Sequence, residues 1–147
     1  MSKIFRGRVV FAKKTKGRAL VTRQGLNTLA SFYQSILKKA KRAICSDQDN
    51  YHLYKKNLTN KIICLPKTIG STAGGAVWEA IAARKIAPKA LLFSEHIDSL
   101  AAAGVALADL WVGRPIVAID QLGSEFLEYV RDGQKIEIED DGTVLVL

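Results

Sequence analysis

The second half of the chain alternates short apolar runs with longer helical patterns, and no other feature limits the possible folds as strongly. The apolar runs cover residues 61–65, 90–93 and 115–119, and each is typical of a strand buried on both faces. Between them, residues 71–85 and 98–110 have the length and spacing of helices. Strands that alternate with helices pair in parallel, because each helix returns the chain to the starting edge of the sheet. The sequence therefore predicts an α/β fold.

The two ends of the chain predict β-structure of a different kind. Residues 6–11 and 18–22 are expected to be short strands on either side of an exposed, lysine-rich turn. Residues 135–139 and 143–147 alternate polar and apolar side chains about an Asp-Asp-Gly turn, which is a strong signal for a hairpin. A short helix is expected at residues 124–130. The expected fold class is a central, partly parallel sheet with flanking helices and additional β-hairpin strands.

The segment between these regions is less regular. Residues 28–44 have apolar side chains at helical spacing and are expected to be helical or irregular, whereas residues 45–60 are polar and are expected to form a loop. No repeat and no low-complexity linker divides the 147 residues, a length that suits one compact unit. We expect residues 1–147 to form a single domain.

Cysteine content and hydropathy bear on the cellular compartment. Cys45 and Cys64 are too few for a disulfide framework and are not spaced as a CxxC pair. No apolar run approaches the roughly 20 residues that cross a bilayer, and the N-terminal segment lacks the apolar stretch of a signal peptide. These features predict a cytoplasmic protein that does not associate with membranes.

The net charge of +8 is unevenly distributed along the chain. Residues 1–61 contain 15 of the 22 lysines and arginines but only two of the 14 acidic residues, Asp47 and Asp49. A basic half of this kind suits nucleic acid, an anionic substrate or an acidic partner subunit, and it equally suits a solvated surface. The half has no recognised nucleic-acid-binding motif and no stripe of interleaved aromatic side chains, so nucleic acid is the least favoured partner.

The segment most suited to chemistry runs over residues 65–76, between a predicted strand and a predicted helix. Open α/β sheets bind ligands at this end of a strand, where small residues admit a ligand and helix N-terminal amides favour an anion. Ser71 and Thr72 would present hydroxyl groups there, beside Gly70 and after Lys67. The simpler interpretation is that Ser71 only caps the helix. The segment lacks the spacing of a P-loop.

Few other residues have the spacing of a catalytic or metal site. His52 and His96 are far apart in the sequence, and the chain has no cysteine cluster and no nucleophile elbow, so we expect no metal ligands in it. Asp98 is expected to cap the helix that follows it. Glu95, Asp98 and Arg114 are also candidates for the edge of the sheet that holds the serine.

Gly70-Ser71-Thr72 lies at the centre of a pattern that spans nearly the whole chain. Its other parts are Arg6-Gly7-Arg8, Ser31-Phe32, Ala87-Pro88-Lys89-Ala90, Asp132-Gly133-Gln134-Lys135 and Asp141-Gly142-Thr143-Val144. In these residues the sequence resembles the small subunit, or swivel domain, of the aconitase X family, which includes phosphomevalonate dehydratase and cis-3-hydroxy-L-proline dehydratase. The resemblance implies a swivelling β/β/α domain.

The resemblance also implies a function. In that family the swivel domain docks on a large subunit that carries the iron or iron–sulfur centre, and a serine of the Gly-Ser-Thr segment is the proton acceptor. It therefore implies that Ser71 removes a substrate proton and that this chain is the small subunit of a heterodimeric or larger hydro-lyase, active only with the large subunit. The implied substrate is a small anionic hydroxy acid, with mevalonate 5-phosphate as the first candidate. We expect Gly70 and Thr72 to contact it, and a phosphorylated substrate favours Lys67 as a further contact.

Two other functions remain open. One is the dehydration of cis-3-hydroxy-L-proline by the same arrangement of subunits. The other is a non-catalytic binding or regulatory module of the same fold, in which Ser71 merely caps a helix.

Overall fold

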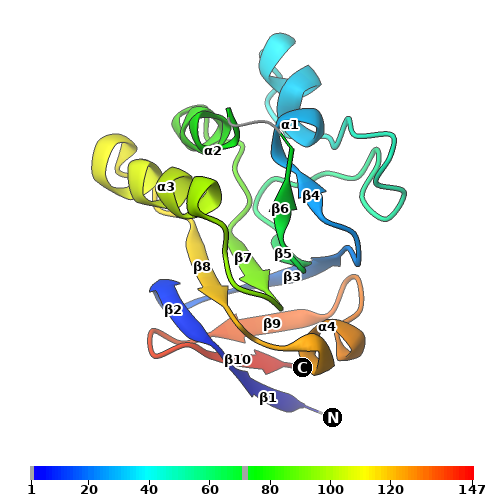
Figure 1. Ribbon diagram of the computed structural model, residues 1–147, viewed down its shortest axis with the longest axis vertical. Coiled ribbons are helices and arrows are strands. Elements are labelled where there is room, and N and C mark those ends of the chain that lie inside the picture. Colours follow the sequence, from blue (N-terminus) through cyan, green and yellow to red (C-terminus); the bar gives the residue numbers. More distant parts are fainter. Residues whose placement is uncertain (1, 71–72) are drawn as a thin grey trace.

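The computed structural model describes residues 2–70 and 73–147 as a mixed α/β structure. The strands in this part of the chain are β1 (Lys3–Arg6), β2 (Arg8–Phe11), β3 (Thr15–Val21), β4 (Leu26–Asn27), β5 (Ile62–Leu65), β6 (Thr68–Ile69), β7 (Ala90–Phe93), β8 (Val117–Asp120), β9 (Lys135–Ile138) and β10 (Thr143–Val146). The helices are α1 (Thr28–Leu37), α2 (Gly74–Ala83), α3 (Ser99–Leu107) with a following π-helical turn η1 (Ala108–Val112), and α4 (Ser124–Tyr129). Helices α1, α2 and α3 lie together on one side of the sheet, and α4 lies near β9 (Figure 1).

The main sheet has the strand order β1-β10-β9-β3-β5-β7-β8-β2. Its central strands β3, β5, β7 and β8 are parallel, and the strands outside them pair in the antiparallel sense. Strand β3 belongs to both parts, because residues 15–18 pair with β9 and residues 19–21 pair with β5. The predicted parallel core and the predicted C-terminal hairpin are both confirmed.

The sheet curls until its two edges approach each other. Strands β1 and β2 lie at opposite ends of the strand order, although only Gly7 separates them in the chain. A Cβ atom at Gly7 would lie 2.5 Å from the carbonyl oxygen of Asp120, so only glycine fits this corner. The prediction of a single strand at residues 6–11 was therefore wrong. The chain turns at Gly7, so β1 ends at Arg6 on one edge of the sheet and β2 begins at Arg8 on the other.

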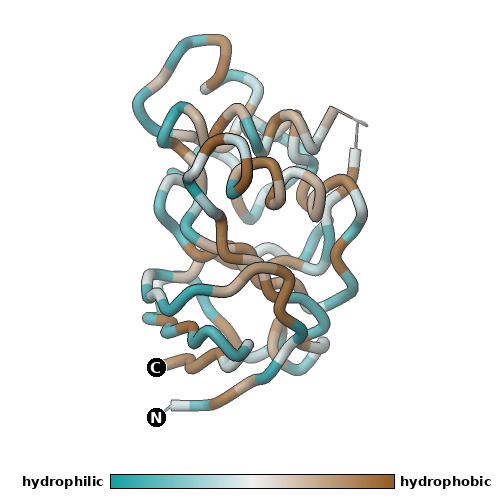
Figure 2. Tube along the Cα trace, turned by 90° about the vertical axis from the view of Figure 1, so that its left-hand side faces the viewer, coloured by the Kyte–Doolittle hydropathy of each residue, from teal (hydrophilic) through white to brown (hydrophobic). Residues whose placement is uncertain are grey.

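Side chains of the central strands alternate between two cores. Leu20, Ile63 and Leu91 belong to the core beneath α1, α2 and α3, whereas Ile62 and Leu92 belong to the core enclosed by β1, β9, β10 and α4. Because both faces of β5, β7 and β8 are covered, every residue of these strands is buried and nearly all are apolar. Figure 2 shows the hydrophobic stretches running through the middle of the molecule, with both termini at one end.

The helices are shorter than the sequence predicts. Helix α1 ends at Leu37 rather than near residue 44, and Lys39 then has a φ of 50°. Helix α3 ends at Leu107, and η1 leads to Gly113, whose φ of 73° is typical of a helix end. The predicted capping role of Asp98 is confirmed, because its carboxylate accepts a hydrogen bond from the Ala101 amide at 3.0 Å. None of the helices in the described part of the chain combines the length and hydropathy needed to cross a bilayer.

Candidate functional site

The chain that follows β5 carries the predicted site. It forms the short strand β6, which pairs in parallel with β4 at the start of α1 and places Gly70 beside Asn27. Gly70 has a φ of 103°, and a Cβ atom there would lie 2.7 Å from the Asn27 Oδ1. The same Oδ1 accepts a hydrogen bond from the Ala30 amide at 3.1 Å and caps α1. Gly70 therefore lies against a side chain that is already fixed.

The predicted proton acceptor, Ser71, and its neighbour Thr72 lie outside the described residues. Ala73 occupies the N-cap position of α2, and the helix begins at Gly74. Helix α2 thus starts three residues later than the sequence predicts.

A cavity of about 170 Å³ lies between β6, α1, α2 and α3. The residues that line it include Thr28, Thr68, Gly70, Gly74, Trp78 and Asp98. Gly70 and Gly74, which line the cavity, are the described residues nearest to Ser71 and Thr72 in the sequence apart from Ala73.

Several of the residues that line this cavity carry polar side-chain groups. The Thr68 hydroxyl donates a hydrogen bond to Asp98 Oδ1, and Asp98 Oδ2 accepts the bond from Ala101, so both carboxylate oxygens are already engaged. The buried Trp78 Nε1 has no hydrogen-bond partner among the described residues. An unpaired buried N–H is ordinarily satisfied by an acceptor such as a water oxygen.

The other predicted residues do not converge on this cavity. Lys67 and Glu95 are exposed at the carboxyl ends of β5 and β7 and do not line it. Arg114 lies at the opposite end of the sheet, where its Nη1 donates a hydrogen bond to the Ala83 carbonyl at 3.2 Å. The expectation that Arg114 faces the same edge as the serine was wrong, because it precedes β8 and therefore lies at the amino ends of the parallel strands.

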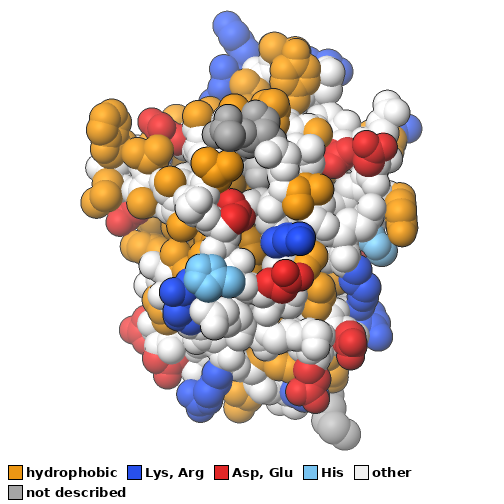
Figure 3. All heavy atoms as spheres, in the orientation of Figure 1, with side chains coloured by type: hydrophobic (Ala, Val, Ile, Leu, Met, Phe, Trp, Pro, Cys, Tyr) orange, Lys and Arg blue, Asp and Glu red, His pale blue; other side chains and the backbone are white. Residues whose placement is uncertain are grey.

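A charged cluster at the carboxyl end of β8 was not predicted from the sequence. The Asp120 carboxylate is fully buried and accepts hydrogen bonds from Arg8 Nε at 2.9 Å, from Arg8 Nη2 at 2.8 Å and from the Ile97 amide at 2.7 Å. His96 Nε2 lies 3.4 Å from Arg8 Nη2. Figure 3 shows acidic, basic and histidine side chains mixed across this view of the molecule. Arg8 and Asp120 are 112 positions apart, so no local spacing signals their pairing.

The pKa of the Asp120 carboxyl is held below its ordinary value. Burial opposes its ionisation, but the hydrogen bonds from Arg8 and Ile97 and the positive charge of Arg8 outweigh this effect. The pKa of Arg8 is raised by the same hydrogen bond to Asp120. The pair therefore stays ionised at neutral pH and holds the guanidinium at the surface.

The described residues do not fit a metal centre. Within residues 2–70 and 73–147, no group of three or more His, Cys, Asp or Glu side chains is placed to hold a metal ion. Cys45 and Cys64 are both buried, and burial raises the pKa of each thiol above its ordinary value. Neither thiol is therefore prepared to bind metal as a thiolate.

Residues 4–146 match the family model of the aconitase X swivel domain. The chain belongs to the aconitase X swivel-domain family, as its sequence resemblance implies.

Two curated relatives carry the same name. The chain is 36% identical to the phosphomevalonate dehydratase small subunit of Aeropyrum pernix over 92 residues, which are 63% of this chain and 64% of the relative. It is 29% identical to the phosphomevalonate dehydratase small subunit of Thermococcus sibiricus over 136 residues, which are 92% of each.

Two solved structures share the fold. The crystal structure of Thermococcus kodakaraensis aconitase X in its holo-form superposes with a TM-score of 0.83 at 23% identity and covers 99% of this chain and 98% of that chain. A solution NMR structure of a UPF0107 protein superposes with a TM-score of 0.78 at 23% identity and covers 99% of both chains. These likenesses confirm the predicted fold class.

Proposed function

We propose that this chain is the small subunit of an aconitase X-type hydro-lyase that dehydrates a small anionic hydroxy acid. Mevalonate 5-phosphate is the first candidate substrate, and the chain acts only when it is assembled with a large subunit. The observation that carries the proposal is the family match over residues 4–146, together with two relatives named phosphomevalonate dehydratase small subunit.

Ser71 is the proton acceptor in this proposal. Dehydration removes a proton from one carbon and hydroxide from the next, and it leaves a carbon–carbon double bond and water. A serine hydroxyl is a weak base at neutral pH, so its alkoxide needs stabilisation. The amino end of α2 begins three residues after Ser71 and favours negative charge. Gly70 and Gly74 line a cavity of about 170 Å³ and leave space beside the backbone, which supports substrate binding in that cavity.

The remaining groups of the active site are proposed to lie on the large subunit. The iron centre is proposed to lie on the large subunit, as the family resemblance implies. Gly70 and Thr72 are proposed to contact the substrate from this chain. Lys67 is exposed at the carboxyl end of β5, where its ammonium group is free to approach a phosphate on the substrate.

The test uses this chain assembled with a purified large subunit. The mixture is expected to dehydrate mevalonate 5-phosphate, whereas neither subunit does so alone. The Ser71→Ala variant is expected to lower kcat by at least about 100-fold, since a general base contributes this much or more. Size-exclusion chromatography should show unchanged assembly. The Ser124→Ala variant, changed at the exposed first residue of α4, is the control and should retain full activity.

Two outcomes would contradict the proposal. Dehydration of cis-3-hydroxy-L-proline in place of the phosphorylated substrate would assign the alternative activity. If the assembled Ser71→Ala variant kept wild-type kcat, the chain would be a binding module rather than a source of the catalytic base.

A further inference from the structure

A second cavity, of about 300 Å³, opens at the amino ends of the parallel strands. Its walls come from the segments that enter β3, β7 and β8 and from the C-terminal end of α2. Lys67 and Gly70, at the carboxyl ends of these strands, do not line it. Its volume is in the range of small-molecule pockets, and it is separate from the site that we propose for dehydration.

Four cationic side chains line this cavity, and no acidic side chain does. They are Lys13, Lys85, Lys89 and Arg114. Within the described part of the chain, none of the four forms an ion pair with a carboxylate. Like charges around one hollow repel one another, and an anion bound between them would offset that repulsion.

Two of these cations are held in place by backbone carbonyls. Lys89 Nζ donates a hydrogen bond to the Lys16 carbonyl at 2.9 Å, and Arg114 Nη1 donates to the Ala83 carbonyl at 3.2 Å. Each contact uses a single N–H donor. An ammonium group has three such donors and a guanidinium group has five, so most of them stay available to a ligand.

Lys85 stands at a position that ordinarily favours glycine. It follows the C-cap residue of α2 and has a φ of 63°, in the left-handed region. The dipole of the helix C-terminus favours a cation nearby, which accounts for part of this choice. The left-handed backbone nevertheless disfavours lysine relative to glycine, so Lys85 occupies this position at a local conformational cost.

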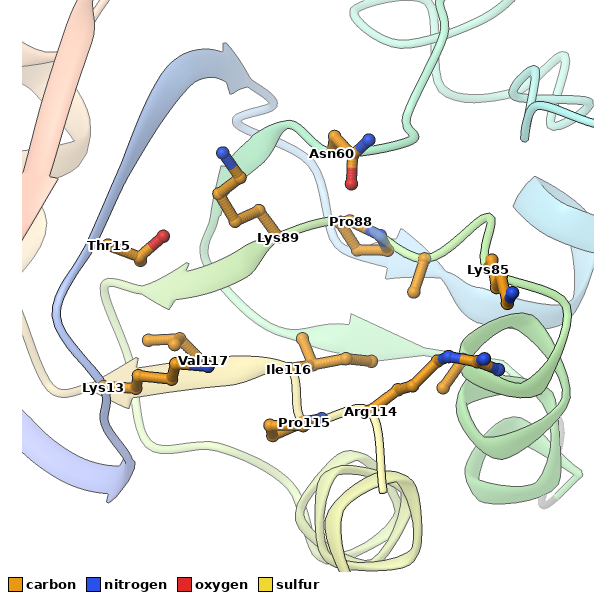
Figure 4. Close-up of a pocket in the computed structure, with 12 residues that line it drawn as sticks. Lys13, Thr15, Asn60, Lys85, Pro88, Lys89, Arg114, Pro115, Ile116 and Val117 are labelled. Carbon is orange, nitrogen blue, oxygen red and sulfur yellow. The ribbon is translucent and has the colours of Figure 1, made fainter. Parts of the chain in front are cut away.

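The cations form two groups with apolar surface between them. Figure 4 shows Lys13 and Lys89 on one side of the cavity and Lys85 and Arg114 on the other. The surface between the two groups is made by Ile116 together with proline, alanine and valine side chains. We propose that this cavity binds a small organic molecule that has an anionic group, phosphate or carboxylate, at each end of a short apolar chain.

Three probes divide this ligand class into its parts. Butane-1,4-diphosphonate has both charged ends, butylphosphonate has one charged end and the apolar chain, and inorganic phosphate has the charge alone. Each is titrated into the full chain at constant ionic strength while backbone amide shifts are followed by NMR. We expect saturable shifts at the amino ends of β7 and β8, with the diphosphonate bound at least about tenfold more tightly than butylphosphonate, and butylphosphonate more tightly than phosphate.

A pair of double variants tests which charges matter. Lys13→Gln with Lys85→Gln removes one cation from each side of the cavity, and neither side chain has a hydrogen bond within the described residues that folding would lose. This variant is expected to weaken diphosphonate binding by about tenfold or more. Lys39→Gln with Lys41→Gln removes the same charge from exposed residues elsewhere, and Lys39 also has a left-handed φ of 50°. This control should bind as the wild type does.

Three results would overturn the inference. They are equal weakening in both double variants, equal affinity for all three probes, and shifts confined to Thr68, Gly70 and Asp98 at the opposite end of the sheet. The last result would assign the ligand to the dehydratase site. The inference does not depend on dehydratase activity, because the binding is measured on this chain alone.

Discussion

Asp120 is a buried carboxylate that forms a salt bridge with the Arg8 guanidinium at the surface. Replacing Asp120 by asparagine keeps the shape of the side chain but exchanges one carboxylate oxygen for an NH2 group. This NH2 group cannot accept the hydrogen bond that the Arg8 guanidinium or the Ile97 amide donates in the wild type. We expect Asp120→Asn to lower the free energy of unfolding at pH 7 by about 2 kcal/mol, measured by urea denaturation. A change below about 0.5 kcal/mol would contradict the assigned hydrogen bonds.

The same carboxylate predicts a pH dependence. The pKa of Asp120 is lower in the folded chain than its ordinary value of 3.8. Its stabilising contribution is therefore complete above that ordinary value and is lost as the pH falls through the folded value. The difference in unfolding free energy between wild type and Asp120→Asn should consequently shrink as the pH falls below about 4. A constant difference between pH 7 and pH 3 would show that folding does not lower the pKa of Asp120.

Gly70 is expected to tolerate no side chain. Gly70→Ala would combine a left-handed backbone with a Cβ contact of 2.7 Å to Asn27. Gly123→Ala is a matched control, because Gly123 has a φ of 93° but open space where its Cβ atom would lie. We expect thermal unfolding to show a loss of about 1 kcal/mol for Gly123→Ala and at least about 2 kcal/mol for Gly70→Ala. Equal losses of unfolding free energy in the two variants would mean that the Asn27 side chain moves away from the new Cβ atom at little cost.

At the scale of residues, local chemistry was predictable and distant pairing was not. The Asp98 cap follows from the identity of one residue at the start of a helical pattern. Arg8, His96 and Asp120 come from three separate segments that meet only after the sheet has formed.

The contact between α2 and α3 depends on the absence of a side chain at Gly104. A Cβ atom there would lie 2.6 Å from the Trp78 Cβ. Helix propensity alone predicts that Gly104→Ala stabilises the chain by about 1 kcal/mol. We expect the opposite sign, a loss of about 1–3 kcal/mol from overpacking, which differential scanning calorimetry would show as a lower Tm. A raised Tm would mean that the two helices are free to separate.

At the scale of elements, the long apolar runs were the most predictable. The runs at residues 61–65, 90–93 and 115–119 correspond to β5, β7 and β8, because strands covered on both faces must be apolar throughout. Strands β4 and β6 were not predicted, because each has only two residues and forms only by pairing with the other. Two residues are too few to show a period in the sequence. The early end of α1 was missed because the lysines beyond Leu37 suit a helix surface as well as they suit a turn.

The edge strand β1 joins the first residues of the chain to the second core. Phe5 is only 7% exposed, and its ring packs edge-to-face on Phe126 with centroids 5.2 Å apart. Phe5→Ala is expected to lower the free energy of unfolding by about 3 kcal/mol in urea denaturation. Ile4 is the neighbouring residue on the opposite face of β1 and is 59% exposed. Ile4→Ala should therefore change the free energy of unfolding by less than about 0.5 kcal/mol. Similar losses of unfolding free energy in the two variants would show that Phe5 does not pack into the second core.

At the scale of the whole molecule, the sequence predicted the layers but not the closure of the sheet. Alternating strands and helices determine a parallel core, and an Asp-Asp-Gly turn determines a hairpin. The placement of that hairpin between β1 and β3 depends on pairings between the two ends of the chain. Such pairings leave no periodic signal in either segment.

Pairing of β1 with β10 has a consequence for biosynthesis. Lys3 pairs with Val146, so β1 leaves the ribosome well before the strand that becomes its neighbour. A nascent chain that stops before β9 exposes the hydrogen-bonding edge of β1 and the ring of Phe5. Chaperones that bind extended apolar segments would therefore engage such a chain at β1, and release from them should coincide with the emergence of β10.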